Sequence, residues 1–520
     1  MAQQDDVFKK ITSHAKEYGF VYQSSEIYDG LSAVYDYGPY GVLLKNNIKE
    51  YWWRSMVQLH ENIVGIDAAI FMHPTTWKAS GHVDAFNDPL VDNKDSKKRY
   101  RADVLVEKEV DKIEQKIKKE VEKAAKRFEN FDESVFLSTN PRCMEYLQKI
   151  SDIEKSLAEA MKAGDMVALK TLIEDLEIAD PETGSRNWTD VRQFNLMFNT
   201  QLGNIAGEEE KLYLRPETAQ GIFVNFLNVQ KSTRQKVPFG IAQIGKAFRN
   251  EIVARQFIFR MREFEQMEMQ FFIRPNTQKE WFATWKEKRM NWHLALGTPQ
   301  SKLRFKDHDN LAHYADAATD VQFEFPFGFK ELEGIHSRTD FDLSSHQKFS
   351  GKKLQYFDPE LGEKGENYVP YVVETSVGCD RMFLAMLSTA YTEEAVPDAQ
   401  GDDATRVVLK LHPALAPIKV AILPLLKNKE ALTDKAREIF DILKFVVNCQ
   451  YDEKDAIGRR YRRQDAIGTP FCITIDFETL ENGTVTIRDR DTLKQERIAV
   501  SDIERIVLQK TDMRLLLHKL

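Results

Sequence analysis

The chain has 520 residues, of which 42% are hydrophobic and 30% are charged, and its formal net charge is −8. This length exceeds one ordinary core, so about two or three domains are expected. No apolar run approaches the ~18 residues of a membrane span, and the opening MAQQDDVFKK lacks the apolar core of a secretory signal. We therefore expect a cytoplasmic protein with no membrane partner.

The four cysteines lie far apart and form no CxxC pair, which predicts reduced core thiols and not a disulfide framework. The negative net charge does not exclude a nucleic-acid partner, because the distribution of charge matters more than its sum. Basic clusters at 97–101, 116–119 and 459–463 are each compatible with a solvated patch. Tyr461 stands between the arginines of the last cluster, which makes it the best candidate for phosphate contact and base stacking.

The N-terminal region begins with a helical segment and continues through YDYGPYG at 35–41. Apolar residues then recur at three- and four-residue spacing, which predicts an amphipathic helix with Pro39 in its first turn. These residues are Leu44, Ile48, Trp52, Met56 and Leu59. From 102 to 185, Lys, Glu and Asp alternate densely around one apolar stripe, which predicts a charged helical insertion with little core of its own, supported by i,i+4 pairs.

The most informative stretch runs from Pro238 to Phe272 and predicts two strands joined by a short polar loop. One face of the predicted hairpin is apolar and is expected to pack against helices. Its residues are Ala242, Ile244, Phe248, Met267, Met269 and Phe271. The opposite face is polar, and its residues are Gln243, Arg249, Glu251, Arg260, Arg262, Phe264, Gln266 and Glu268.

The polar face of this hairpin has two interpretations. One is an ordinary salt-bridged exterior. The other is a nucleotide site, because Phe264 stands among the charges as a ring that can stack on a base. In such a site guanidinium groups pair with phosphate oxygens, and a carboxylate accepts from an exocyclic amine.

Two further strands are predicted downstream, after RPETAQG at 215–221 and the helix that follows it. FGFKELEGIHSRTDFDL at 327–343 alternates apolar and polar residues, which predicts a strand with Glu331 and Glu333 on one face. VPYVVETSVGCDRMFLAML at 369–387 predicts a strand, a tight turn and a buried helix. Glu374 and Ser376 share a face of this strand, Gly378 opens the turn, and Arg381 lies in the first helical turn.

The C-terminal region is predicted to be a separate small domain. Acidic residues and prolines mark 401–416 as a linker. From 417 onward, β-rich apolar runs alternate with a helical stretch near 434–447, which predicts an α/β domain.

Together these strings resemble the class II aminoacyl-tRNA synthetases, and in particular the glycyl-tRNA synthetases of the homodimeric type. FRNE at 248–251 with REFEQME at 262–268 is similar to motif 2, the segment at 35–59 to motif 1, and the segment at 369–387 to motif 3. The run that begins at Gly458 resembles the anticodon-binding domain shared by the glycyl, histidyl, prolyl and threonyl enzymes. The resemblance covers nearly the whole chain.

The resemblance implies an α+β fold, with an antiparallel sheet that carries the site, flanking helices, a helical insertion and a C-terminal α/β anticodon-binding domain. The implied domains are an N-terminal part of the catalytic domain at 1–101, the insertion at 102–185, the catalytic core at 186–400, the linker at 401–416 and the anticodon-binding domain at 417–520. Several members carry cysteines near the sites of Asn93 and Ser96. This chain has none there, so no structural zinc is expected.

The implied reaction joins glycine to ATP as glycyl-adenylate and then passes glycine to the terminal ribose of tRNA(Gly). The task of the protein is then positioning and charge neutralisation, with Arg249 and Arg381 as the implied catalytic residues. The implied ATP contacts are Arg249, Asn250, Glu251, Phe259, Arg260, Phe264, Glu331, Leu332, Gly378 and Arg381. Mg²⁺ is the expected cofactor, with Glu331 and Glu374 as candidate ligands.

Selectivity for glycine must come from excluding anything larger, because the substrate offers only an ammonium, a carboxylate and two hydrogens. The implied glycine contacts are Arg101, Glu217, Phe264, Glu268, Glu374, Ser376 and Arg338. The implied tRNA contacts are Arg459, Arg460, Arg462 and Arg463. Two alternatives stay open: a class II synthetase for another amino acid, such as threonine or proline, and a tRNA-binding paralogue without catalysis.

Overall fold

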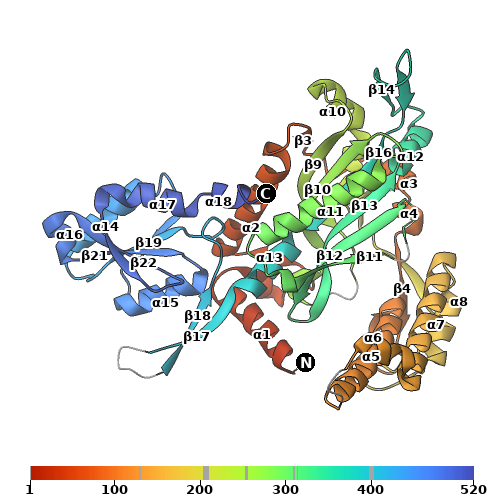
Figure 1. Ribbon diagram of the computed structural model, residues 1–520, viewed down its shortest axis with the longest axis horizontal. Helices are drawn as coiled ribbons and strands as arrows, with labels where there is room; N and C mark the ends of the chain where they lie inside the picture. The colour runs from red at the N-terminus through yellow and green to blue at the C-terminus, as the bar shows by residue number, and fades with distance from the viewer. Residues whose placement is uncertain are drawn as a thin grey trace. The chain divides into compact units, whose positions relative to one another are not determined.

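The computed structural model describes residues 2–127, 131–202, 210–251, 256–308, 311–312, 314–397 and 403–520. The chain divides into two compact units. Figure 1 colours the ribbon by residue number, so the segments of each unit can be followed along the chain. The first unit comprises residues 1–80, 201–248 and 255–520, and the second comprises residues 81–200 and 249–254.

The first unit is built on a seven-stranded sheet with the strand order β11-β12-β13-β16-β10-β9-β3. The strands are β3 (Ile63–Gly65), β9 (Phe239–Phe248), β10 (Glu263–Ile273), β11 (Leu303–Asp307), β12 (Ala317–Phe325), β13 (Gly328–Thr339) and β16 (Tyr371–Gly378). Neighbouring strands are antiparallel except β3 and β9, which are parallel. The predicted antiparallel sheet is confirmed.

The predicted hairpin is the pair β9–β10, and its two faces are as the alternation indicated. Met267 is paired with Ile244 on the buried face, and the next pair, Glu268 with Gln243, faces the opposite side. The strands are shorter than predicted, however, because β9 ends at Phe248 and β10 begins at Glu263. The four charged residues predicted on the polar face beyond these ends therefore lie outside the strands: Arg249, Glu251, Arg260 and Arg262.

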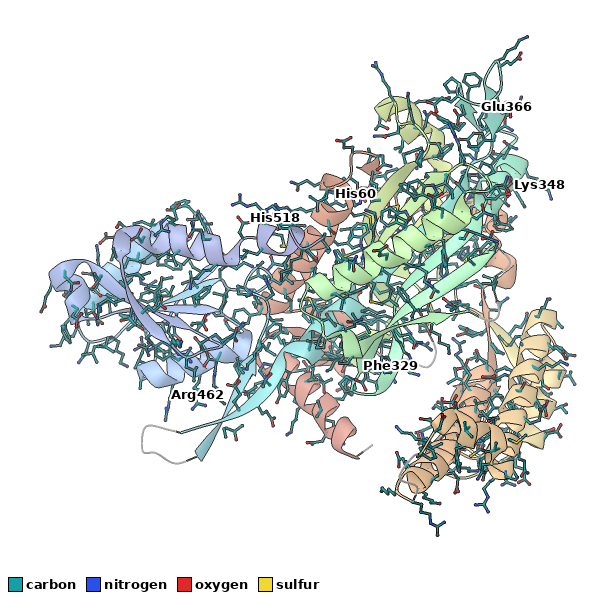
Figure 2. The ribbon with its side chains drawn as sticks, viewed as in Figure 1. His60, Phe329, Lys348, Glu366, Arg462 and His518 are labelled. Carbon is teal, nitrogen blue, oxygen red and sulfur yellow. The ribbon has the colours of Figure 1, made fainter. Side chains whose placement is uncertain are left out.

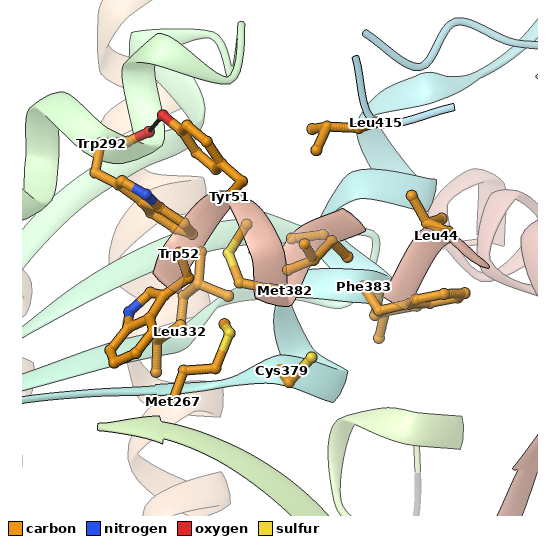
Figure 3. Close-up of a cluster of buried hydrophobic side chains, with 14 of the residues drawn as sticks. Leu44, Tyr51, Trp52, Met267, Trp292, Leu332, Cys379, Met382, Phe383 and Leu415 are labelled. Carbon is orange, nitrogen blue, oxygen red and sulfur yellow. Dashed lines mark hydrogen bonds between the residues drawn. The ribbon is translucent and has the colours of Figure 1, made fainter. Parts of the chain in front are cut away.

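Three helices bury the apolar face of this sheet. They are α2 (Pro39–Trp53, continued by a π-helical turn at Arg54–Gln58), α11 (Gln278–Ala295) and α13 (Cys379–Ala390). The predicted stripe of α2 is buried at Leu44, Ile48, Trp52 and Met56, whereas Leu59 is exposed. Figure 3 shows Trp52 beside Met267 and Leu332, and Tyr51 stacked on Trp292 at 5.1 Å between ring centroids. Each such side chain contributes about 1.5–3 kcal/mol when it leaves water.

A β-bulge in β13 corrects the prediction that Glu331 and Glu333 share a face. Val321 of β12 is paired with Glu333, but its neighbour Gln322 is paired with Glu331, so Leu332 is the extra residue. The two glutamates consequently point to opposite sides of the sheet. Glu333 is fully buried against α11, where Arg289 Nε donates to it at 2.5 Å.

The second unit has a core of its own, which corrects the prediction that the insertion has little. Its helices are α5 (Ala102–Ala125), α6 (Glu133–Thr139), α7 (Pro141–Ala163) and α8 (Met166–Asp175), beside a sheet of β5 (Arg99–Arg101), β4 (Asn87–Asp92) and β6 (Arg192–Asn195). The stripe from Val106 to Ile117 faces residues of α7 and α8. Val91, Tyr100 and Trp188, outside the predicted 102–185, complete this core.

The C-terminal part forms the predicted α/β domain. Its sheet has the order β20-β19-β21-β22-β23, with β19 (Val420–Pro424), β20 (Cys449–Tyr451), β21 (Phe471–Ile475), β22 (Thr484–Asp489) and β23 (Gln495–Ala499). Its helices are α14 (Glu430–Leu443), α15 (Ile457–Ile467), α16 (Phe477–Asn482), α17 (Ile503–Thr511) and α18 (Arg514–Leu517). The predicted linker is largely wrong, because β18 (Asp403–Leu409) pairs with β17 (Tyr391–Pro397); residues 401 and 402 lie outside the described residues.

Shorter elements complete the two units. They are α1 (Ala2–Glu17), β1 (Val21–Gln23), η1 (Glu26–Tyr28), β2 (Tyr35–Tyr37), α3 (Pro74–Ala79), α4 (His82–Ala85), β7 (Asn199–Leu202), β8 (Glu210–Tyr213), α9 (Ala219–Val224), α10 (Phe226–Thr233), η3 (Phe257–Phe259), η4 (Gln300–Lys302), α12 (Phe341–Ser350), β14 (Tyr356–Asp358), β15 (Glu366–Tyr368) and η5 (Val500–Asp502). Over the described part of the chain, every helix is too short or too polar to cross a bilayer.

Candidate active site

The polar face of the large sheet gathers the predicted acidic residues at its centre. On β16, Ser376 lies opposite Glu268 of β10 and Gly334 of β13. Two positions away, Glu374 lies opposite Gln270 and His336. Residues two apart on a strand share a face, so the side chains from these three strands converge.

An arginine and two carboxylates fix the geometry beside this centre. Arg338 Nη1 donates to Glu374 Oε2 at 2.8 Å, while Arg338 Nε and Nη2 donate to the two oxygens of Asp342 at 2.8 and 3.0 Å. The guanidinium carbon lies 4.0 Å from the ring centroid of Tyr314. All three ionic side chains are buried, and a buried charge that is paired in this way is held in one orientation.

The surroundings shift the pKa values of the two central glutamates in opposite directions. Burial raises the pKa of Glu268 well above its usual range, and the neighbouring carboxylates of Glu374 and Glu217 raise it further. Burial also opposes the ionisation of Glu374, but Arg338 and His336 outweigh it and lower the pKa of Glu374 to about 2. These surroundings thus favour the protonated form of Glu268 and the ionised form of Glu374.

The RPETAQG segment is anchored next to these acids. Arg215 Nε donates to the backbone oxygen of Lys246 at 2.6 Å, and Arg215 Nη1 donates to that of Ala68 at 2.7 Å. Thr218 donates its hydroxyl to Glu268. Glu217 accepts from the Gln220 side chain at 2.9 Å, so the segment brings a third carboxylate to the centre.

A second group of predicted residues meets at the start of α13. Arg381 Nη1 lies 3.1 Å from Glu331 Oε2, and Arg381 Nε donates to the backbone oxygen of Phe259 at 3.3 Å. The guanidinium carbon lies 4.6 Å from the ring centroid of Phe259. Gly378 ends β16 directly before α13, and Leu332 is buried. Phe264 is half-buried on the polar face of β10, opposite Ala247, while Arg260 follows Phe259.

Four predicted residues belong to the second unit and are described within it. Asn250 donates its backbone N–H to Leu196 at 2.8 Å, and the guanidinium carbon of Arg249 lies 5.3 Å from the ring centroid of Phe86. Burial opposes the charge of Arg101, but Asp103, Asp88 and the buried Glu251 outweigh it and raise the pKa of Arg101.

The loop expected to lack zinc is held by hydrogen bonds. The side-chain oxygen of Asn93 accepts from the backbone N–H groups of Asp95 and Ser96, both at 3.1 Å. The Ser96 hydroxyl donates to Asp180 at 2.5 Å.

The four arginines predicted to contact tRNA lie on or beside α15, but not with one role. Arg459 is exposed and Arg462 is half-exposed, and Figure 2 shows Arg462 pointing away from the domain. Arg463 pairs with Asp452 and Asp455 at 2.7 and 2.6 Å. Arg460 corrects the prediction: it is buried and donates to the backbone oxygens of Pro424, Asp452 and Leu425, so it stabilises a loop.

Sequence reasoning missed several side chains of the site. They are Thr218, Gln270, Tyr314, His336 and Asp342. Gln270 and His336 could have been predicted from the sequence, because each continues the period-two alternation that marks Glu268 and Arg338. Tyr314 and Asp342 lie on other elements, and their place in the site follows only from the tertiary fold.

Comparison with protein families fits this geometry. Residues 199–390 match the tRNA synthetase class II core domain (G, H, P, S and T). Residues 88–196 match glycyl-tRNA synthetase insertion domain 1, and residues 419–510 match the anticodon binding domain. An antiparallel sheet with a polar face, together with these matches, defines a class II tRNA synthetase.

Similarity to individual proteins shows which family within this class the chain belongs to. The glycine–tRNA ligase of Chlorobaculum tepidum is 53% identical over 493 residues, which cover 95% of this chain and 97% of the relative. The glycine–tRNA ligases of Staphylococcus haemolyticus and Staphylococcus aureus (strain JH9) are 47% and 46% identical, each over 96% of this chain and 98% of the relative. The chain belongs to the glycine–tRNA ligase family.

Proposed function

We propose that this protein attaches glycine to tRNA(Gly), using ATP and a glycyl-adenylate intermediate. The observation that carries the proposal is the buried set of acids on the polar face of β10 and β16, together with the pair Arg381–Glu331 at the start of α13. Carboxylates pair with the ammonium of an amino acid, and an arginine binds the oxygens of a polyphosphate. The full-length similarity to glycine–tRNA ligases supports the same reaction.

Glu217, Glu268 and Ser376 are proposed to contact glycine. Arg338 and Glu374 are proposed to form a rigid boundary of the glycine site. Arg338 and Glu374 are buried and bonded to each other, so they cannot move aside for a side chain larger than hydrogen. A rigid wall rejects alanine by overlap. Phe264 and Arg101 complete the proposed glycine set.

The adenylate-forming step needs charge neutralisation and no nucleophilic side chain. We assign Arg249 to the α-phosphate and the incoming carboxylate, with Asn250 beside it. Glu251 accepts from the adenine amine, Phe264 stacks on the ring and Arg260 lies nearby. Arg381 covers the other side of the ring, reaches the γ-phosphate and is supported by Phe259, Leu332 and Gly378. The glycine carboxylate then attacks the α-phosphorus in line, and pyrophosphate leaves.

Mg²⁺ supplies positive charge to the triphosphate. Of the two candidate ligands, Glu331 fits this role better, because half of its side chain is exposed. Arg381, which pairs with Glu331, can bind phosphate in place of this carboxylate. Both oxygens of Glu374 already accept, from His336 at 2.7 Å and from Arg338 and Gln270 at 2.8 and 2.6 Å. Glu374 is therefore assigned to orienting these side chains.

Partners and location complete the proposal. The exposed Arg459 and the half-exposed Arg462 contact tRNA, with Arg463 beside them. The protein acts as a homodimer in the cytoplasm, as the resemblance to the homodimeric synthetases implies. The division into a catalytic core at 186–400 and an anticodon-binding domain at 417–520 is supported by the family matches at 199–390 and 419–510.

The charging of tRNA(Gly) transcript with each of glycine, alanine, serine, threonine and proline tests this function. We expect charging with glycine alone. Charging with threonine or proline would support a synthetase for another amino acid, and tRNA binding without charging would support a paralogue without catalysis.

A further inference from the structure

A separate cluster of metal-binding side chains lies toward the β11 edge of the sheet. Its members are His308, Asp320 and His336, whose ligand atoms all lie within 4.8 Å of one another. Asp320 lies opposite Gly334 and His336 opposite Ala318, and the backbone N–H of His308 donates to Ala318 at 3.0 Å. This register places all three side chains on the polar face.

His308 and Asp320 lie within ion-pair distance of each other. His308 Nε2 lies 2.9 Å from Asp320 Oδ1, yet among the residues that the structure describes this buried nitrogen has no partner with hydrogen-bond geometry. An imidazole nitrogen and a carboxylate oxygen held this close together can also serve as ligands of one ion.

His336 is prepared for coordination by its neighbours. Its Nδ1 lies 2.7 Å from Glu374 Oε1, so that Nδ1 donates to the carboxylate and Nε2 is left with a lone pair. The ring lies over Gly334: a Cβ there would come within 3.0 Å of His336 Cε1 and 3.4 Å of Nε2. Glycine at this position thus leaves room for the imidazole beside Asp320.

We propose that His308, Asp320 and His336 bind one Zn²⁺-class transition-metal ion. Two imidazoles and a carboxylate suit Zn²⁺, whereas Mg²⁺ prefers oxygen ligands, so this site is distinct from the one assigned to Glu331. Ligand atoms around a tetrahedral ion with bonds of about 2.0–2.1 Å lie roughly 3.3 Å apart, so small side-chain movements complete the site. Three protein ligands leave one position open.

The ion has a positioning role. It holds His336 in the tautomer that donates to Glu374, and Glu374 in turn holds Arg338. This role rests on the proposed function, whereas metal binding itself does not.

Calorimetric titration of the metal-free full-length protein with Zn²⁺ tests the site, without ATP, glycine or tRNA. We expect one ion per chain. His308→Ala and Asp320→Asn each lower the affinity at least ~100-fold, and Glu374→Gln, which removes the acceptor for His336, lowers it ~10–100-fold. The control His518→Ala changes an exposed histidine at the C-terminal end (Figure 2) and leaves the affinity unchanged.

The absorption spectrum of added Co²⁺ gives a readout that needs no variant. Intense d–d bands of a tetrahedral nitrogen–oxygen site support the proposal, whereas the spectrum of hydrated Co²⁺ overturns it. Absence of Zn²⁺ binding, or binding that His308→Ala and Asp320→Asn weaken no more than His518→Ala, also overturns it. Circular dichroism shows that the variants compared are folded.

Discussion

At the scale of single residues, the site depends on two nearby glutamates whose pKa values are shifted in opposite directions. Burial and two nearby carboxylates raise the pKa of Glu268 and favour its protonated form, whereas Arg338 and His336 keep Glu374 ionised. A bound ammonium favours the ionised form of Glu268. Binding of glycine is therefore coupled to loss of a proton.

This coupling predicts that glycine binding releases up to one proton per site. Because the pKa of Glu268 is raised in the free protein, the affinity for glycine rises as the pH rises toward that pKa and levels off above it. Calorimetry in two buffers of different ionisation enthalpy measures the proton. Glu268→Gln is expected to weaken binding and remove the pH dependence; an affinity of the unmodified protein that does not change with pH would contradict the assignment.

Removal of the Arg249 guanidinium is expected to lower adenylate formation by at least ~10²–10³-fold, because it is assigned to the developing charge at the α-phosphate. Glycine-dependent pyrophosphate exchange measures the effect for Arg249→Ala, while tRNA binding stays largely intact. Arg186→Ala, which alters an exposed arginine of the same unit paired with Glu177, serves as the control. Equal exchange rates in the two variants would remove Arg249 from the mechanism.

The residues of the site could be predicted where a short sequence motif contains them. They could not be predicted where a strand departs from regular alternation. The string ETS located Glu374 and Ser376 on one face. The bulge at Leu332 has no such signal, so alternation placed Glu333 beside Glu331, whereas Glu333 is paired with Arg289 in the core. Arg460 was predicted to lie on the surface. The sequence alone does not distinguish a buried arginine that donates to backbone oxygens from its exposed neighbours.

At the scale of elements, the hairpin β9–β10 depends on a close approach at Gly245. A Cβ there would lie 2.2 Å from Arg215 Nη2. Arg215 is buried and its other guanidinium nitrogens are held by backbone oxygens, so the side chain has no free rotamer to adopt. The hairpin and the RPETAQG segment are thereby locked together.

Gly245→Ala is expected to lower the free energy of unfolding by ~1–3 kcal/mol, as overpacking does, and to raise KM for glycine by displacing Glu217. Denaturant unfolding and exchange kinetics measure the two effects. The matched control is Gly458→Ala in α15, where no atom among the described residues lies within 4 Å of the new Cβ; a small stabilisation is expected there. A neutral Gly245→Ala would show that Arg215 is not fixed.

The existence of the main elements followed from periodicity, but their ends did not. The period-two run at 238–272 and the apolar stripe of α2 are both present. The loop between β9 and β10 takes more residues than alternation indicated, because Arg249 and Glu251 belong to the second unit. Likewise the acidic and proline-containing segment at 401–416 gave no sign that 403–409 pairs with β17.

At the scale of the whole molecule, the C-terminal domain is packed against the catalytic part of the first unit. Met513, Leu516 and Leu517 belong to the same hydrophobic cluster as α2 and α13, and His14 Nε2 lies 2.8 Å from the backbone oxygen of Ala466. Deletion of 417–520 would therefore expose core residues. Surface substitutions are the cleaner test of its role with tRNA.

Arg459→Ala combined with Arg462→Ala is expected to raise KM for tRNA about tenfold and to leave pyrophosphate exchange unchanged, because these side chains lie on α15 of the C-terminal domain and not among the acids of the large sheet. The slope of tRNA affinity against salt concentration should fall by about one counterion for each arginine that no longer meets a phosphate. Arg505→Ala, on α17 and paired with Asp502, is the control. Unchanged charging by the double variant would place the tRNA surface elsewhere.

The most direct measurement is ATP–pyrophosphate exchange by the unmodified protein with each amino acid in turn. The account predicts exchange that depends on glycine and is absent with alanine, serine, threonine and proline, because the walls formed by Arg338 and Glu374 are buried and fixed. Exchange driven by a larger amino acid, or none with glycine, would contradict the central claim.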